Sequence, residues 1–188
     1  MEFFAVLGGA SAKIYDDIID NNIPMNETVL ESLKGIQWIS LTAISLNDFN
    51  LTLVMYAFCI LNWFANPDAF VIPYEISLLI LYPFFFIWNF STASFFSFKD
   101  IFCILIIIGS AVFEPVIHKF IHYTEGSAEK FLLRLSSAII TFAVLMIGKE
   151  IDISSSIITF IIYSLTYTTV SAIFQGYAFK NGLFVENT

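Results

Sequence analysis

Three aspartates close the first apolar stretch of this chain, in the segment YDDIIDNN at residues 15 to 22. On a helix, Asp16 and Asp20 are four residues apart and Asp17 and Asp20 are three apart, so all three carboxylates can converge on one patch. They also fall at a helix C-terminus, where the helix dipole disfavours negative charge. Carboxylates gathered against this repulsion suit a hard divalent cation such as Mg²⁺, which takes oxygen ligands and bridges to phosphates. The segment therefore predicts a metal site.

A second group of ionisable residues lies much later in the chain, in the segment FEPVIHKFIHYTEGSAEK. Its members are spaced four, four, three and four residues apart, which would form one polar stripe if the segment continued as a single helix. The stripe begins inside an apolar run, and ionisable groups within a membrane span usually face a cavity or the bundle interior. The residues of this stripe are Glu114, His118, His122, Glu125 and Glu129.

Both groups also have simpler interpretations. The aspartates can merely end a helix, with Asn21 and Asn22 as turn residues and with Lys13, one turn back, neutralising one carboxylate. The histidines can sit at a membrane interface, and residues 125–130 can form an exposed connection in which Gly126 breaks the helix. A zinc or di-iron site is disfavoured, because the chain contains neither an HExxH nor an ExxH sequence.

Composition predicts the elements that must position these residues. Of the 188 residues, 58% are hydrophobic and 13% are charged, against about 25% charged in a soluble domain, and the mean hydropathy is +0.82. Runs such as ILIIIGSAVF do not alternate as the strands of a barrel would. We expect an all-α fold, a polytopic transmembrane helix bundle of about seven helices that forms a single domain over residues 1–188. The formal net charge of −8 argues against nucleic acid as a partner.

Turn residues and caps divide the chain into these helices. The small residues of GGASA, Gly8 to Ala12, are expected to let the first helix approach its neighbours closely. Thr28 to Glu31 reads TVLE, the pattern of a capping box at the start of the second helix. The predicted helices cover residues 2–20, 28–46, 51–64, 71–88, 100–116, 131–147 and 155–174.

Seven crossings would place the two acidic groups on one side of the membrane. The end of the first helix shares that side with the loops near 21–34, 65–70, 117–130 and 175–188. The basic residues on that side are Lys34, Lys119, Lys130, Arg134 and Lys180, and those on the other side are Lys99 and Lys149. By the positive-inside rule, we expect an integral, multi-pass membrane protein with both acidic clusters on the cytoplasmic side.

The segment YDDIIDNN resembles the first Asp-rich motif, N/D-D-x-x-D-x-x-x-D, of the UbiA superfamily of intramembrane prenyltransferases. In that family the motif ends a helix, and a second Asp-rich motif follows on the same cytoplasmic side. EPVIHKFIHYTEGSAEK has the position and polarity of the second motif, with Glu and His where the family shows Asp. Pro24 stands where the family has the last aspartate of the first motif, and the chain is shorter than is usual in the family.

The resemblance implies an enzyme that acts on a prenyl diphosphate, with the prenyl chain in the lipid bilayer and an unidentified acceptor. It implies that Mg²⁺ is bound by Asp16, Asp17 and Asp20, with support from Glu114, Glu125 and Glu129. It also implies catalytic roles for Asp17, Asp20 and Glu125. In the same resemblance Lys130 and Arg134 would meet the diphosphate, and His118 or His122 would serve as a base or a ligand.

A non-catalytic membrane protein is the competing interpretation. Such a protein, a cation carrier or an accessory subunit, would bind ions or a partner through the acidic clusters. A transport path should place polar groups through the whole membrane depth, whereas the predicted fifth and sixth helices have few at mid-span. The gathering of charge at one face therefore favours the enzyme.

Overall fold

The structure, a computed structural model, describes residues 1–65, 73–118, 120 and 123–184, with side chains except at 59, 61–65, 73–79, 111, 112, 114, 115 and 118. Every regular element in this part is a helix and none of its residues lies in a strand, so the prediction of an all-α chain is confirmed. The elements are α1 (Glu2–Asp20), α2 (Glu27–Ser45), α3 (Phe49–Ala65), α4 (Pro73–Asn89), the short 3-10 helix η2 (Phe90–Thr92), α5 (Phe98–His118), α6 (Ala128–Glu150) and α7 (Ser155–Lys180).

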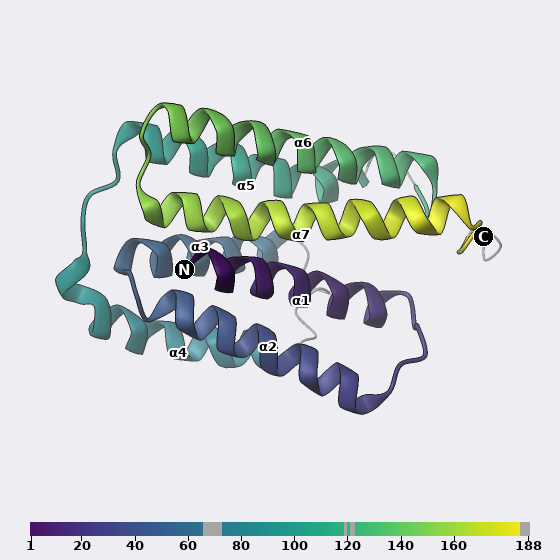
Figure 1. Ribbon diagram of the computed structural model, residues 1–188, viewed down its shortest axis with the longest axis horizontal. Coiled ribbons are helices and arrows are strands. Elements are labelled where there is room, and N and C mark those ends of the chain that lie inside the picture. Colours follow the sequence, from purple (N-terminus) through teal and green to yellow (C-terminus); the bar gives the residue numbers. More distant parts are fainter. Residues whose placement is uncertain (66–72, 119, 121–122, 185–188) are drawn as a thin grey trace.

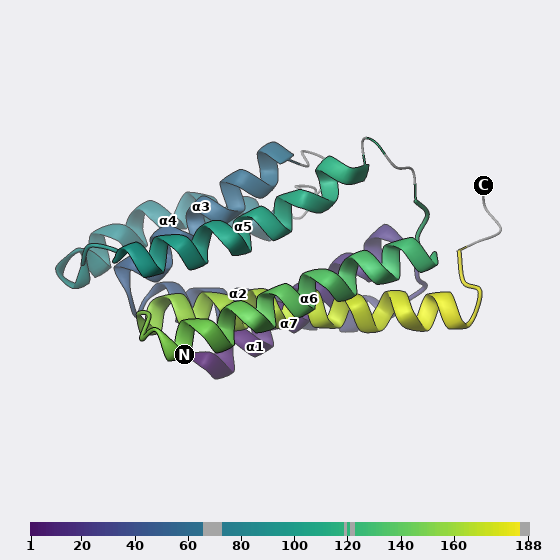
Figure 2. The same cartoon turned by 90° about the horizontal axis from the view of Figure 1, so that it is seen from above.

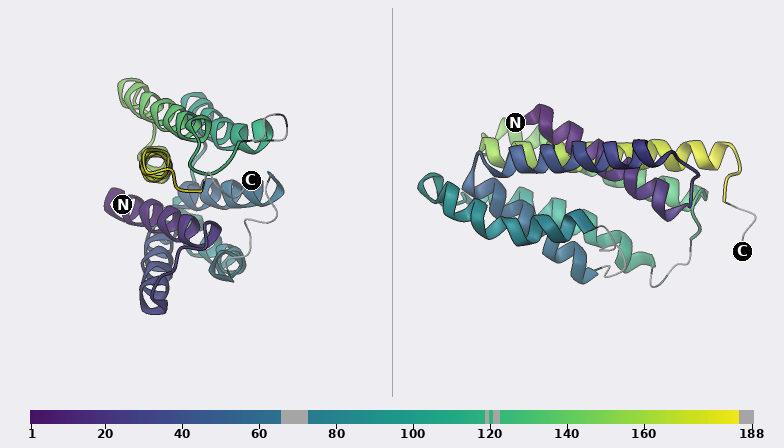
Figure 3. Two further views of the ribbon diagram at one scale, coloured as in Figure 1. Left: turned by 90° about the vertical axis from the view of Figure 1, so that its right-hand side faces the viewer. Right: turned by 90° about the horizontal axis from the view of Figure 1, so that it is seen from below.

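The helices form two layers (Figures 1 and 2). One layer holds α2, α1, α7 and α6 side by side in that order, and the other holds α4, α3 and α5. Helix α7 is central, because it packs against α1 and α6 in its own layer and against α3 and α5 in the other. The left view of Figure 3 looks almost along this helix, in yellow. Its residues Ile157, Phe160 and Ile161 are completely buried.

Two adjacent glycines let α1 approach both of its neighbours. A Cβ atom at Gly9 would lie only 2.6 Å from the carbonyl oxygen of Tyr163 in α7. A Cβ atom at Gly8 would lie 3.2 Å from the Cβ of Ser40 in α2. Backbones can come this close only where side chains are small, so the predicted close packing through GGASA is confirmed.

Helix α2 is capped by a different residue from the one predicted. The side-chain oxygen of Asn26 accepts a hydrogen bond of 2.9 Å from the backbone N–H of Thr28. The predicted capping box from Thr28 to Glu31 is therefore wrong. Asn is preferred over Thr as an N-cap, and the acidic Glu27 that follows is favourable in the first turn of a helix.

Apolar side chains cover much of the surface. Among the described residues, two helices, α6 with 23 residues and α7 with 26, are long and apolar enough to cross a membrane. Large apolar side chains also lie open on α4, on α5 and between them, with Trp88, Phe95 and Phe98 among the most exposed. Extended apolar surface of this kind marks contact with a membrane or with a partner.

At the end of the bundle where α5 and α7 begin, polar side chains cap the backbone; we call it the capped end (left in Figure 1). The Asp100 carboxylate accepts hydrogen bonds from the backbone N–H groups of Ser97, at 3.0 Å, and of Ser154, at 2.9 Å. The ammonium of Lys99 donates to the carbonyl of Ile151 at 2.8 Å. Asp100 thereby ties the first turn of α5 to the residue that precedes α7.

Candidate functional site

The charged residues of α1 form a buried ion-pair group. Lys13 is only 3% exposed, and its Nζ lies 2.6 Å from Oδ2 of Asp16 and 2.9 Å from Oδ1 of Asp17. Spacings of three and four residues on a helix place the ammonium between the two adjacent carboxylates. Lys13 thus pairs with two aspartates, where the sequence led us to expect one.

A tyrosine of α7 completes this group. The hydroxyl of Tyr167 donates a hydrogen bond of 3.1 Å to Oδ2 of Asp16. The Nζ of Lys13 lies 5.4 Å from the centroid of the Tyr167 ring, close enough for the aromatic face to attract the ammonium. The other oxygen of Asp17, Oδ2, is buried and has no hydrogen-bond partner in the described part of the chain.

Helix α1 ends directly after the ion pairs. Asp20 is its last residue and is exposed, and the side chain of Asn21 donates a hydrogen bond of 2.9 Å to the carbonyl of Asp17. Asn22 then turns the chain with a φ of 50°. The interpretation of YDDIIDNN as a helix end is therefore confirmed, and the same segment also gathers carboxylates around Lys13.

The start of α6 brings a second charged group to this end of the bundle. Oε1 of Glu125 lies 2.9 Å from Nζ of Lys130, and Oε2 of Glu125 accepts a hydrogen bond from Nε2 of Gln175 in α7. The backbone N–H of Gly126 donates to Oε1 of Gln175 at 2.9 Å. Gln175 therefore holds the turn before α6 with both the oxygen and the nitrogen of its amide.

Gly126 fits this turn for two reasons. Its φ of 73° lies in the left-handed region, where a side chain is strained. A Cβ atom at this position would also collide with the carbonyl oxygen of Leu183, in the turns that follow α7. The Glu125–Gly126 turn is thus fixed against α7 and the residues after it.

The two groups lie within electrostatic range of each other across α7. Asp20 is attracted by Lys130 and repelled by Glu125, and Lys13 is repelled by Arg134 in the second turn of α6. Figure 1 shows the end of α1, the start of α6 and the end of α7 at the same end of the bundle. We call this set the charged cluster; its members are Lys13, Asp16, Asp17, Asp20, Glu125, Lys130, Arg134, Tyr167 and Gln175.

The cluster keeps Glu125 ionised. Partial burial alone would raise the pKa of Glu125. The ammonium of Lys130, the hydrogen bonds from Lys130 and Gln175, and the more distant Lys13 outweigh burial and hold the pKa below its ordinary value. At neutral pH Glu125 is therefore a carboxylate that accepts hydrogen bonds, which suits binding rather than proton donation.

The predicted polar stripe from Glu114 to Glu129 does not lie on one helix. Helix α5 ends at His118, Glu125 lies in a turn, and Glu129 is exposed in the first turn of α6. The alternative interpretation, in which Gly126 breaks the helix, is confirmed: the side chain of Ser127 caps a new helix, with a bond of 3.2 Å from the N–H of Lys130. The side chains of Glu114 and His118, and all of His122, lie outside the described residues.

The charged cluster does not fit Mg²⁺ in this arrangement. Mg²⁺ requires oxygen ligands at about 2.0–2.1 Å in near-octahedral geometry. The described residues contain no group of three His, Cys, Asp or Glu side chains that could hold a metal ion. The ammonium of Lys13 also takes the place between Asp16 and Asp17 that a cation would need. Mg²⁺ binding by these aspartates stays a prediction from the sequence.

The sequence interpretation missed the contribution of α7. Tyr167, Ser171 and Gln175 are spaced four residues apart, so they lie along one face of the helix. Ser171 and Gln175 are buried, with 0% and 1% exposure. Polar residues repeated every four positions along this span were the signal that could have identified them.

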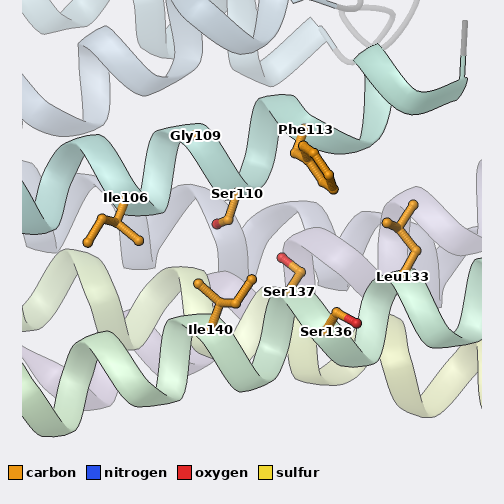
Figure 4. A pocket seen from close by; sticks show the side chains of 8 residues that line it. All are labelled: Ile106, Gly109, Ser110, Phe113, Leu133, Ser136, Ser137 and Ile140. Atoms are coloured by element: carbon orange, nitrogen blue, oxygen red, sulfur yellow. The ribbon is translucent and has the colours of Figure 1, made fainter.

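An apolar cavity of about 270 Å³ lies between α5 and α6 (Figure 4). Its walls include Ile106, Phe113, Leu133 and Ile140, and Leu133 is adjacent in sequence to Arg134 of the charged cluster. Hydroxyl groups also line it, contributed by Ser110 of α5 and by Ser136 and Ser137 of α6. The cavity therefore offers apolar surface with a few polar groups, as is usual for small-molecule sites.

Comparison with known proteins gives no match to a family model, to a curated protein or to a solved structure.

Proposed function

We propose that this chain is a polytopic membrane protein that binds a prenyl diphosphate at the charged cluster, as an intramembrane prenyltransferase resembling the UbiA superfamily. The membrane assignment is supported by the apolar composition, by the two helices long enough to span a bilayer, and by the exposed apolar side chains. By the positive-inside rule, the charged cluster would face the cytoplasm.

One observation carries the proposal of a diphosphate site. Two segments far apart in the sequence, the aspartate-bearing end of α1 and the Glu125–Arg134 segment, meet at one end of the bundle through α7. The predicted enzyme requires this juxtaposition, because acidic and basic groups from both segments must act on one headgroup. A bundle whose helices alternate in direction places these two segments at the same end, and the contacts of Tyr167 with Asp16 and of Gln175 with Glu125 link both of them to α7.

Different parts of this chain would bind the diphosphate headgroup and the apolar tail of the substrate. Lys130 and Arg134 would attract the diphosphate and stabilise the charge that it gains when it leaves. The α5–α6 cavity, whose wall includes Leu133, the residue before Arg134 in the sequence, would give the apolar chain a place to lie. In the UbiA superfamily, which the chain resembles, Mg²⁺ supplies further charge stabilisation. In this structure the ammonium of Lys13 lies between Asp16 and Asp17, where the resemblance would place the ion.

The test is the release of diphosphate from geranylgeranyl diphosphate by the full-length protein in detergent, with a range of acceptors. Arg134→Gln removes a guanidinium that would attract the diphosphate and is expected to lower the rate by about tenfold or more. Lys34→Gln removes an exposed ammonium of α2, outside the cluster, and is expected to leave the rate unchanged. No release by the native protein would reject the enzyme, and equal rates in native protein and Arg134→Gln would reject the charged cluster as its site.

A cation carrier or accessory subunit is the second candidate, and one observation favours it. Buried polar side chains follow α7 from its first turn as far as Gln175, and an ion path would need polar groups along the helix. These residues are Ser156, Thr159, Ser164, Ser171 and Gln175. Cation uptake into vesicles that contain the purified protein, without diphosphate release, would select this candidate over the enzyme.

A further inference from the structure

Lys13 has the position of a bound cation. Its Nζ lies within 2.9 Å of an oxygen of each of two carboxylates and over the ring of Tyr167. The residue is only 3% exposed. Asp16 contributes Oδ2 and Asp17 contributes Oδ1. A divalent ion shared by these two carboxylates would have to occupy the same space as the ammonium.

The charges of the cluster are already nearly balanced. Its acidic side chains are Asp16, Asp17, Asp20 and Glu125, and its basic side chains are Lys13, Lys130 and Arg134. Four acids and three bases leave one negative charge, so a doubly charged ion would reverse the sign of the cluster. A metal would also add repulsion against the Lys13 ammonium, which is strong where water is excluded.

We infer that Lys13 is the resident cation of this site, so that the α1 aspartates are neutralised by the chain itself and bind no divalent metal. The inference rests on the proposed headgroup site and changes its chemistry: a diphosphate would be recognised without a divalent ion. It also means that Asp16 and Asp17 are a latent metal site, which removal of the ammonium would open. The unpartnered Oδ2 of Asp17 would supply a further oxygen to an incoming ion.

Binding of Mn²⁺, used in place of Mg²⁺ and followed by its electron paramagnetic resonance signal, tests the inference on the full-length protein without any prenyl substrate. Native protein and Lys34→Met are expected to leave the free Mn²⁺ signal unchanged. Lys34 pairs with Glu31 outside the cluster and is the matched control. Lys13→Met is expected to bind Mn²⁺ at least about tenfold more tightly than native protein, because it exposes two carboxylates to the ion.

Lys13→Met leaves two aspartates without their ammonium, so an ion that binds them should stabilise the folded variant. Thermal unfolding measures this stabilisation. Mn²⁺ is expected to raise the Tm of Lys13→Met, and of Lys13→Gln, which retains a hydrogen-bond donor, but not that of native protein. The inference is overturned if native protein binds Mn²⁺ and Asp16→Asn abolishes that binding. It is also overturned if neither Lys13 variant gains Mn²⁺ affinity or Tm. Failure of the enzyme proposal would instead appear as absent diphosphate release.

Discussion

The two ends of the bundle use polar residues in different ways. At the capped end, side chains of Asp100 and Lys99 bind backbone groups of α5 and of the connection between α6 and α7. At the other end, in the charged cluster, side chains bind each other: Lys13 contacts Asp16 and Asp17. At the capped end, side chains provide hydrogen-bond partners for backbone groups at the ends of helices. The ion pairs of Lys13 provide no such partner for the backbone.

This difference separates structure from candidate function. Backbone N–H groups at a helix start require acceptors, so the hydrogen bonds of Asp100 have a sufficient explanation in folding. A buried ion pair seldom stabilises a protein more than apolar residues of the same size would. Lys13, Asp16 and Asp17 therefore have no such explanation, and the proposed binding of a charged headgroup would supply one.

Removing the ammonium of the cluster should have the largest effect on stability. Lys13→Met leaves the buried Asp17 and its neighbour Asp16 without a counter-charge, and the loss of one partner of a buried pair costs about 3–5 kcal/mol. We expect a decrease of this size in the free energy of unfolding, measured by chemical denaturation of the detergent-solubilised protein. The helical content before denaturation should equal that of native protein.

The control for this variant is a lysine with the same spacing to its partner. Lys34 lies 2.6 Å from Glu31 on α2, but the pair is far more exposed, so Lys34→Met should cost less than about 1 kcal/mol. Equal losses in the two variants would mean that burial of the cluster does not distinguish it from an ordinary surface pair.

At the capped end, Asp100→Ala should cost about 1–2 kcal/mol, because backbone N–H groups of Ser97 and Ser154 lose their acceptor. The effect should be confined to stability, since Asp100 is in the first turn of α5, which begins at the end of the bundle opposite the start of α6 (Figure 1). Thermal unfolding measures the first part, and diphosphate release by the folded variant measures the second. A loss of release in folded Asp100→Ala would show that the two ends are coupled.

Sequence pattern predicted the helices better than it predicted the cluster. Apolar runs and turn residues predicted α1 with both of its ends, because helix length and the Asn21–Asn22 turn are local properties. The acidic end of α1 was also identified. The pairing of Lys13 with both aspartates was not, because a lysine side chain can reach several partners and only burial against Tyr167 selects among them.

The second half of the site shows the limit of helical spacing. The four-residue spacing of the Glu114–Glu129 stripe was compatible with one helix, but the turn at Gly126, which was the alternative interpretation, assigns Glu125 and Glu129 to different elements. Gln175 was missed because its partner, Glu125, lies far from it in the sequence. Contacts of this kind depend on which helices become neighbours, and spacing along one segment holds no information about that.

Acid should weaken the Glu125–Lys130 ion pair in a defined pH range, with the smallest effect of the three. Because the folded-state pKa of Glu125 is below its unfolded value, its ion pair stabilises the protein above the unfolded pKa, about 4.3, and this contribution is lost as pH falls through the folded pKa. The Glu125 side chain is 37% exposed, so solvent screening limits the contribution to less than about 1 kcal/mol.

The measurement compares the Tm of native protein and Glu125→Gln at pH 7, 5 and 3. Native protein should have the higher Tm at pH 7 and 5, and the difference should be smaller at pH 3, because pH 3 lies below the unfolded pKa and the stabilisation is lost as the pH falls toward the folded pKa. Glu150→Gln, which removes an exposed carboxylate near the capped end, is the matched control. A difference that already disappears between pH 7 and 5 would mean that burial outweighs Lys130, and that the cluster does not hold Glu125 as a carboxylate.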